Sequence, residues 1–114
     1  MLTVDALRGW GANVKEGMAR CLNKEDFYLR LVGMSLADAS FDKLDAAIAS
    51  GDVEKAFDAA HNLKGATGNL SLTPVYDPIC DITEALRGQK TMPDISAAHG
   101  RLTAALSELR ELAK

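Results

Sequence analysis

The spacing of apolar residues is the feature that most constrains the fold, because it follows a helical period along most of the chain. Between positions 24 and 50, apolar side chains recur every seven residues, at Phe27, Met34, Phe41 and Ile48, with Leu31 and Leu44 between them. A seven-residue repeat is typical of helices that pack in a left-handed bundle. The run contains no proline, so the pattern predicts one long helix over 24–50, with room for a bend near residues 35–40. No stretch of the chain alternates apolar and polar residues as a strand would.

The next two segments have recognisable helix boundaries. Gly51 suits the left-handed residue that follows a helix, and Asp52 is a good N-cap, so a second helix is expected over 53–70. Pro74 is tolerated at a first helical position, which places the start of a third helix over 74–88.

Asp94 is expected to cap a last helix over 94–112. The first 22 residues are interrupted by three glycines and are expected to form short helices that cap one end of the core. The chain is therefore predicted to be all-α: a single domain over 1–114, built as an antiparallel up-down-up-down four-helix bundle with short N-terminal capping helices.

Composition narrows the range of partners and locations. The chain has 114 residues and a formal net charge of −3, and no basic stripe suggests contact with nucleic acid. The first residues lack the pattern of a signal peptide, and no apolar run approaches the roughly 20 residues of a membrane span. We expect a cytoplasmic, monomeric protein, with Cys21 and Cys80 present as reduced thiols.

One stretch, residues 58–70 (DAAHNLKGATGNL), stands out for its chemistry. On a helix, His61, Gly65 and Gly68 share a face, and Lys64 projects about 60° away at the border of the apolar stripe. Two glycines inside a helix cost about 1 kcal/mol each relative to alanine, which suggests that a partner approaches the backbone beside the imidazole. A neutral imidazole is also a good nucleophile near neutral pH.

The segment AHNLKGATGNL resembles the phosphorylation-site motif of histidine-containing phosphotransfer (Hpt) domains, which is roughly A-H-x-L-K-G-x-x-x-x-L-G. Residues 17–32 (GMARCLNKEDFYLRLV) and 81–87 (DITEALR) are similar to the flanking helices of the same family. The resemblance covers roughly residues 13–110. It departs from the pattern at Ser71, which replaces a frequent glycine and is expected to change only how the turn closes.

The resemblance implies a phosphoryl carrier that is not an autonomous enzyme. His61 would accept a phosphoryl group from a receiver-domain phospho-aspartate or a histidine kinase and pass it to another receiver aspartate. Lys64 would steady the phosphoryl oxygens, and Gly65 and Gly68 would leave room for the receiver. No cofactor is expected on this chain, because the family's Mg²⁺ sits on the partner receiver domain.

The residues also allow two other interpretations. A plain helical adaptor would bind signalling partners through the same glycines without carrying phosphate. A metal site would need to combine the two cysteines with His61 and His99, but these residues lack the sequence spacing typical of metal ligands. His99 is expected to pack or to face solvent. As a docking surface, we expect residues 38–42 to lie level with His61 on the neighbouring helix.

Overall fold

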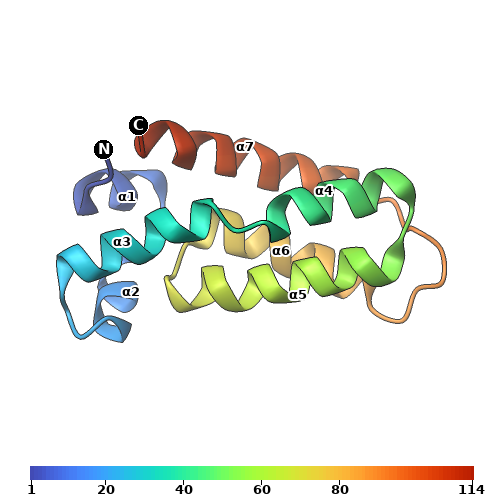
Figure 1. Ribbon diagram of the computed structural model, residues 1–114, viewed down its shortest axis with the longest axis horizontal. Helices are drawn as coiled ribbons and strands as arrows, with labels where there is room; N and C mark the ends of the chain where they lie inside the picture. The colour runs from blue at the N-terminus through green and yellow to red at the C-terminus, as the bar shows by residue number, and fades with distance from the viewer.

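The computed structural model describes residues 1–114, and every regular element in it is an α-helix (Figure 1). The all-α prediction is therefore confirmed. The helices are α1 (Val4–Trp10), α2 (Val14–Arg20), α3 (Glu25–Leu36), α4 (Ser40–Ser50), α5 (Val53–Asn69), α6 (Thr73–Leu86) and α7 (Ser96–Leu112). None of these helices is long and apolar enough to cross a membrane.

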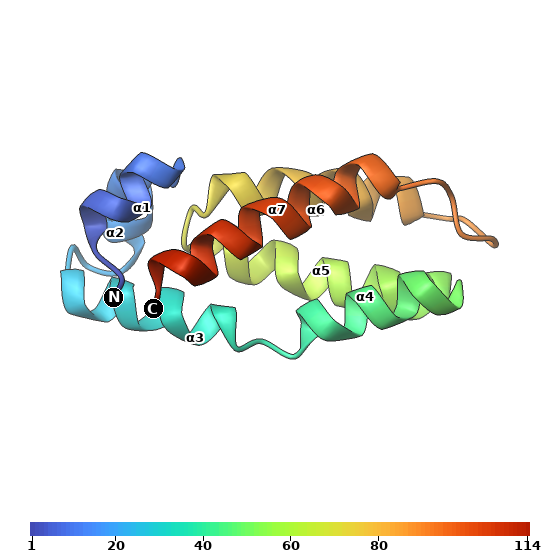
Figure 2. The same cartoon turned by 90° about the horizontal axis from the view of Figure 1, so that it is seen from above.

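The last four helices pack in the order of the sequence, α4 on α5, α5 on α6 and α6 on α7. The two short helices, α1 and α2, lie at the end of the molecule occupied by α3 and by both chain termini (Figures 1 and 2). There α1 packs against α7 and α2. Trp10 stabilises the contact between α1 and α7, because its indole N–H donates a hydrogen bond to the Ala105 carbonyl at 3.2 Å.

The single helix predicted over 24–50 is two helices, separated at residues 37–39. Asp38 explains the interruption: its side-chain Oδ1 accepts a hydrogen bond from the Ser40 backbone N–H at 2.8 Å. This bond offers the backbone a local alternative to the helical ladder. The break therefore falls where the sequence left room for a bend.

The predicted inward stripe is wrong in α3 and right in α4. Phe27 and Met34 are 40% and 62% exposed, while Tyr28 and Val32 are fully buried. In α4, Phe41 is buried as expected. A seven-residue repeat that crosses a helix break loses its phase, since the two helices turn different faces to the core.

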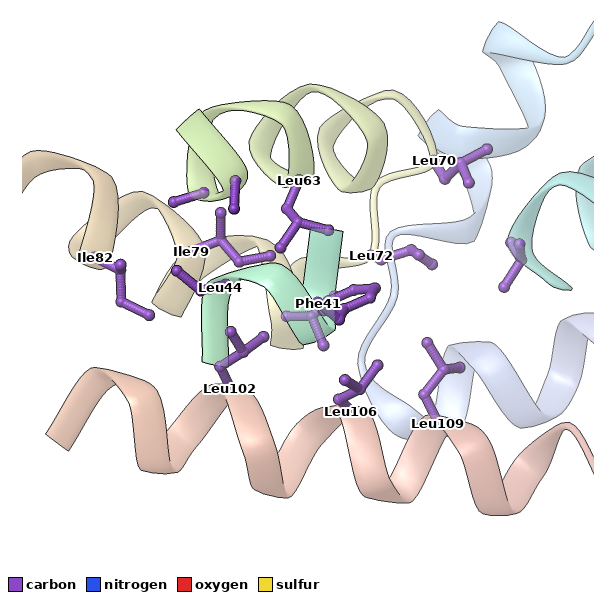
Figure 3. Packing of buried hydrophobic residues seen from close by; sticks show 14 of the residues in the cluster. Phe41, Leu44, Leu63, Leu70, Leu72, Ile79, Ile82, Leu102, Leu106 and Leu109 are labelled. Atoms are coloured by element: carbon purple, nitrogen blue, oxygen red, sulfur yellow. The ribbon is translucent and has the colours of Figure 1, made fainter. Parts of the chain in front are cut away.

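The core lies between α4, α5, α6 and α7, as Figure 3 shows. Leu44 of α4, Leu63 of α5 and Ile79 of α6 are each fully buried there. Leu102 and Leu106 of α7 close the opposite side. Because α5 directs Leu63 into this core, the opposite side of the helix is left facing outward.

Candidate functional site

The site is built on α5, whose start is fixed by a side-chain cap. Asp52 accepts a hydrogen bond from the Lys55 backbone N–H at 3.1 Å, and Gly51 ends α4 in the left-handed conformation with φ 73°. The buried face of α5 is formed by Ala56, Ala59, Ala60, Leu63 and Thr67. His61 lies outside this buried stripe and is exposed.

His61 is exposed, and no hydrogen bond to another side chain or to the backbone holds its imidazole. Its ring stacks on Phe57, one turn earlier, with centroids 6.1 Å apart and planes 14° apart. The Phe57 side chain is only partly buried. It lies between the core and the imidazole.

Lys64 lies one turn after His61, is partly buried and forms no ion pair. Its ammonium is close enough to α6 to act on Glu84. The pKa of Glu84 is held below its usual value, first by a hydrogen bond from Arg87, then by the Arg87 charge and more weakly by Lys64. Lys64 therefore leaves an unpaired positive charge near the imidazole.

The two glycines of the motif have different surroundings. Gly65 is exposed, and a Cβ added there would meet no atom within 4 Å. At Gly68 an added Cβ would lie 2.8 Å from Cε1 of Tyr76, so this glycine accommodates the Tyr76 ring. Gly65 leaves open surface beside His61, and Gly68 allows α6 to approach α5.

A cleft of about 610 Å³ runs from His61, Lys64 and Gly65 toward α2 and the start of α6. Its other walls are polar: they include Asn13, which is the N-cap of α2, with Glu16 and Arg20 of α2 and Thr73, Tyr76 and Asp77 of α6. Hydrogen bonding to Cys80, and then the negative charge of its thiolate form, raises the pKa of Tyr76. The cleft thus offers polar contacts next to an exposed nucleophile.

Arg20 is a residue of the cleft that the sequence did not single out. Its Nη1 donates hydrogen bonds to the Gly68 carbonyl at 2.9 Å and to the Ser71 hydroxyl at 2.7 Å. Glu16 holds the guanidinium from within α2. A cation is favourable at a helix C-terminus, where carbonyl groups lack helical partners. Arg20 therefore caps α5 from another helix, and no local pattern in the sequence signals this.

Ser71, where the sequence departs from the motif, adopts the left-handed conformation with φ 54°. Glycine takes this conformation without steric cost, which gives a physical reason for glycine at this position. The Ser71 hydroxyl accepts from Arg20 and donates to Glu16 Oε1 at 3.2 Å. These two hydrogen bonds offset the conformational cost.

The other histidine and the two cysteines do not line the cleft. His99 is partly buried, and its Nε2 lies 2.7 Å from Asp45 Oδ1, which links α7 to α4. Cys21 is buried, and neither cysteine forms a disulfide. No group of three or more histidine, cysteine, aspartate or glutamate side chains is arranged to hold a metal ion.

Comparison with known proteins adds one finding. Residues 34–112, more than half of the chain, match the family model described as Hpt domain. Neither the curated proteins nor the solved structures yielded a match. Hpt domains are phosphotransfer carriers, and they interact with receiver domains and histidine kinases in two-component systems. Residues 1–33, including α1 and α2, lie outside the matched region.

Proposed function

We propose that this chain, which belongs to the Hpt domain family, carries a phosphoryl group on His61 within a phosphorelay. The donor would be the phospho-aspartate of a receiver domain or a histidine kinase, and the acceptor another receiver aspartate. The observation that supports this most is the exposure of His61 beside a polar cleft, with Lys64 and Gly65 one turn away.

The transfer step asks little of this chain beyond a positioned nucleophile. A lone pair on the His61 imidazole attacks the phosphorus of the aspartyl phosphate, so an N–P bond forms as the P–O bond to the carboxylate breaks. The carboxylate leaves with the electron pair, and the reverse reaction delivers the phosphoryl group to the next aspartate. Such a transfer depends on in-line positioning and on charge neutralisation. Mg²⁺ would be held by the receiver domain and no cofactor by this chain.

Lys64 would assist by attracting the phosphoryl oxygens. Ion pairs near a protein surface contribute about 1 kcal/mol or less, so we expect Lys64 to tune the rate of transfer. We expect Lys64→Ala to slow the transfer about fivefold and to leave it measurable.

Gly65 would keep the approach of the receiver domain open. An added side chain has free space in the isolated protein, so a large residue there should disturb docking and leave the fold intact. The predicted docking contacts at Asp38 and Asp42 stay a prediction. Reversing either charge should change the transfer rate, and an unchanged rate would count against a contact there.

The central experiment is incubation with a phosphorylated receiver domain, followed by a search for acid-labile, base-stable label on this chain. Wild type should be labelled and His61→Gln should not. His99→Gln is the matched control, because it removes the other histidine of the chain, and it should be labelled like wild type. Equal labelling of wild type and His61→Gln would disprove the proposal.

The same samples test the alternative, a helical adaptor. Binding of the receiver domain without any transfer in wild type, with binding retained in His61→Gln, would favour that function. We also expect a monomer, and sedimentation at several protein concentrations would test this.

A further inference from the structure

The aromatic ring beneath the reactive imidazole has no role in the function proposed so far. Phe57 precedes His61 by one helical turn, and the two rings are nearly parallel, 6.1 Å apart between centroids. Long side chains of a helix lean toward its N-terminus, so the imidazole is directed back over the turn that carries Phe57. The stack is therefore a direct result of the spacing between the two residues.

The Phe57 ring is itself held in place by its neighbours. It is partly buried and packs against the hydrophobic core. The guanidinium of Arg87, at the end of α6, lies 5.4 Å from the ring centroid, and Glu84 binds this guanidinium at 3.1 Å. A cation over an aromatic face is attracted by the ring quadrupole. Phe57 is thus fixed by α6 as well as by its own helix.

We propose that Phe57, fixed by Arg87, is a positioning residue that orients the His61 imidazole for phosphoryl transfer. This inference rests on the function proposed above. An exposed histidine samples several rotamers, and a hydrogen bond to one ring nitrogen is the usual way to select one. His61 has no such bond, whereas the Nε2 of His99 is held by Asp45.

Stacking orients an imidazole without using either of its nitrogens. The two rings are nearly parallel, with centroids 6.1 Å apart, so Phe57 lies on the side of one imidazole face. The ring nitrogens lie on the edge, where a phosphoryl group must arrive in the plane of the ring. A carboxylate partner would occupy one nitrogen, as Asp45 does at His99. The stack thus serves a residue that needs a free nucleophilic nitrogen.

The first test is spectroscopic and independent of transfer. The chemical shifts of the carbon-bound ring protons of His61 should differ between wild type and Phe57→Leu, because only wild type has the ring current of Phe57. Phe57→Tyr, which keeps the ring, should keep the shift, and thermal unfolding should show that both variants fold. Absence of the shift in wild type would overturn the proposal.

The second test measures the rate of transfer from a phosphorylated receiver domain. An aromatic contact of this kind corresponds to about a two- to tenfold change in rate, so Phe57→Leu should be slower by that factor. Phe57→Tyr should restore the rate, and Arg87→Lys, which keeps the charge but loses the planar group, should show a smaller loss.

The outcomes separate the proposal from the function on which it rests. If Phe57→Leu loses the ring-current shift and transfers as fast as wild type, the positioning role is wrong. Slow transfer in Phe57→Tyr as well would mean that the ring is not the cause. If wild type takes up no label at all, the function is wrong, and the NMR shift still decides whether Phe57 orients the imidazole.

Discussion

Two regions, one on α5 and one just beyond its end, differ in how closely other segments approach the chain. At Gly65 an added Cβ would meet nothing within 4 Å. At the end of α5, a Cβ added to Gly17 of α2 would lie 2.6 Å from the Leu70 carbonyl oxygen and 2.7 Å from the Tyr28 ring. We call the first region, His61 to Gly65, the open stretch, and the second, where Gly17, Tyr28 and Leu70 meet, the closed end.

The same residue type thus serves opposite purposes in the two regions. In the open stretch glycine leaves surface for a partner, and at the closed end it lets α2 touch the chain that follows α5. The closed end should therefore govern stability, and the open stretch should govern transfer. Substitutions at the closed end give the strongest test of this division.

The largest effect is expected for Gly17→Ala. The methyl group must displace the Leu70 carbonyl or the Tyr28 ring, and neither is free to move, because the Tyr28 hydroxyl donates a hydrogen bond to that carbonyl at 2.9 Å. Overpacking against fixed atoms costs about 2–3 kcal/mol. Thermal unfolding should show a Tm lower by roughly 10 °C.

Gly65→Ala is the matched control, because it makes the same change in the open stretch. Alanine is favoured over glycine in a helix by up to about 1 kcal/mol, so the Tm of this variant should be unchanged or slightly raised. Equal losses of Tm in the two variants would contradict the division between the closed end and the open stretch.

The second prediction uses the ionisation of Tyr28 at the closed end. Burial, and then the charge of the Cys21 thiolate, raises the pKa of Tyr28 from 10.0 to about 12. The folded protein therefore keeps the phenol proton over a pH range in which the unfolded chain has lost it. Stability falls as pH rises from 10 toward 12, and this group accounts for about 2 kcal/mol of the loss by pH 12.

Tyr28→Phe isolates that contribution. Near pH 7 the variant should be less stable by about 1 kcal/mol, because the hydrogen bond to the Leu70 carbonyl is lost. Above pH 10 its stability should fall less steeply than that of wild type, so that the two curves of unfolding free energy converge and cross. Parallel curves up to pH 12 would show that Tyr28 does not titrate as a buried group.

The sequence predicts the open stretch far better than the closed end. Local spacing sets the helix and directs Leu63 inward, which leaves His61 on the exposed face. The closed end depends on contacts such as that between Arg20 and the Gly68 carbonyl, which no helical period encodes. The stripe predicted for α3 failed for a related reason. Its repeat was counted through the break at residues 37–39, where the phase changes.

The third prediction concerns Arg20, the cap that α2 supplies to α5. Arg20→Ala leaves the Gly68 carbonyl and the Ser71 hydroxyl without this donor. The side chain is 44% exposed, so water replaces part of the interaction, and we expect a loss of about 1 kcal/mol. Arg8→Ala is the control: its ion pair with Asp5 is more exposed, and its loss should be close to zero. Chemical denaturation should rank the two variants in this order.

The smallest net effect is expected where the sequence departs from the family motif. The left-handed conformation at position 71 costs a non-glycine residue about 1 kcal/mol, and Ser71→Gly removes this cost. It also removes the hydroxyl that bonds to Arg20 and Glu16, which is worth a similar amount. In wild type these changes should nearly cancel.

In an Arg20→Ala background much of the hydrogen bonding is already lost, so Ser71→Gly should stabilise that variant by about 1 kcal/mol. A double-mutant cycle measured by chemical denaturation tests this coupling, and additive effects would mean that the hydroxyl does not offset the strain at Ser71.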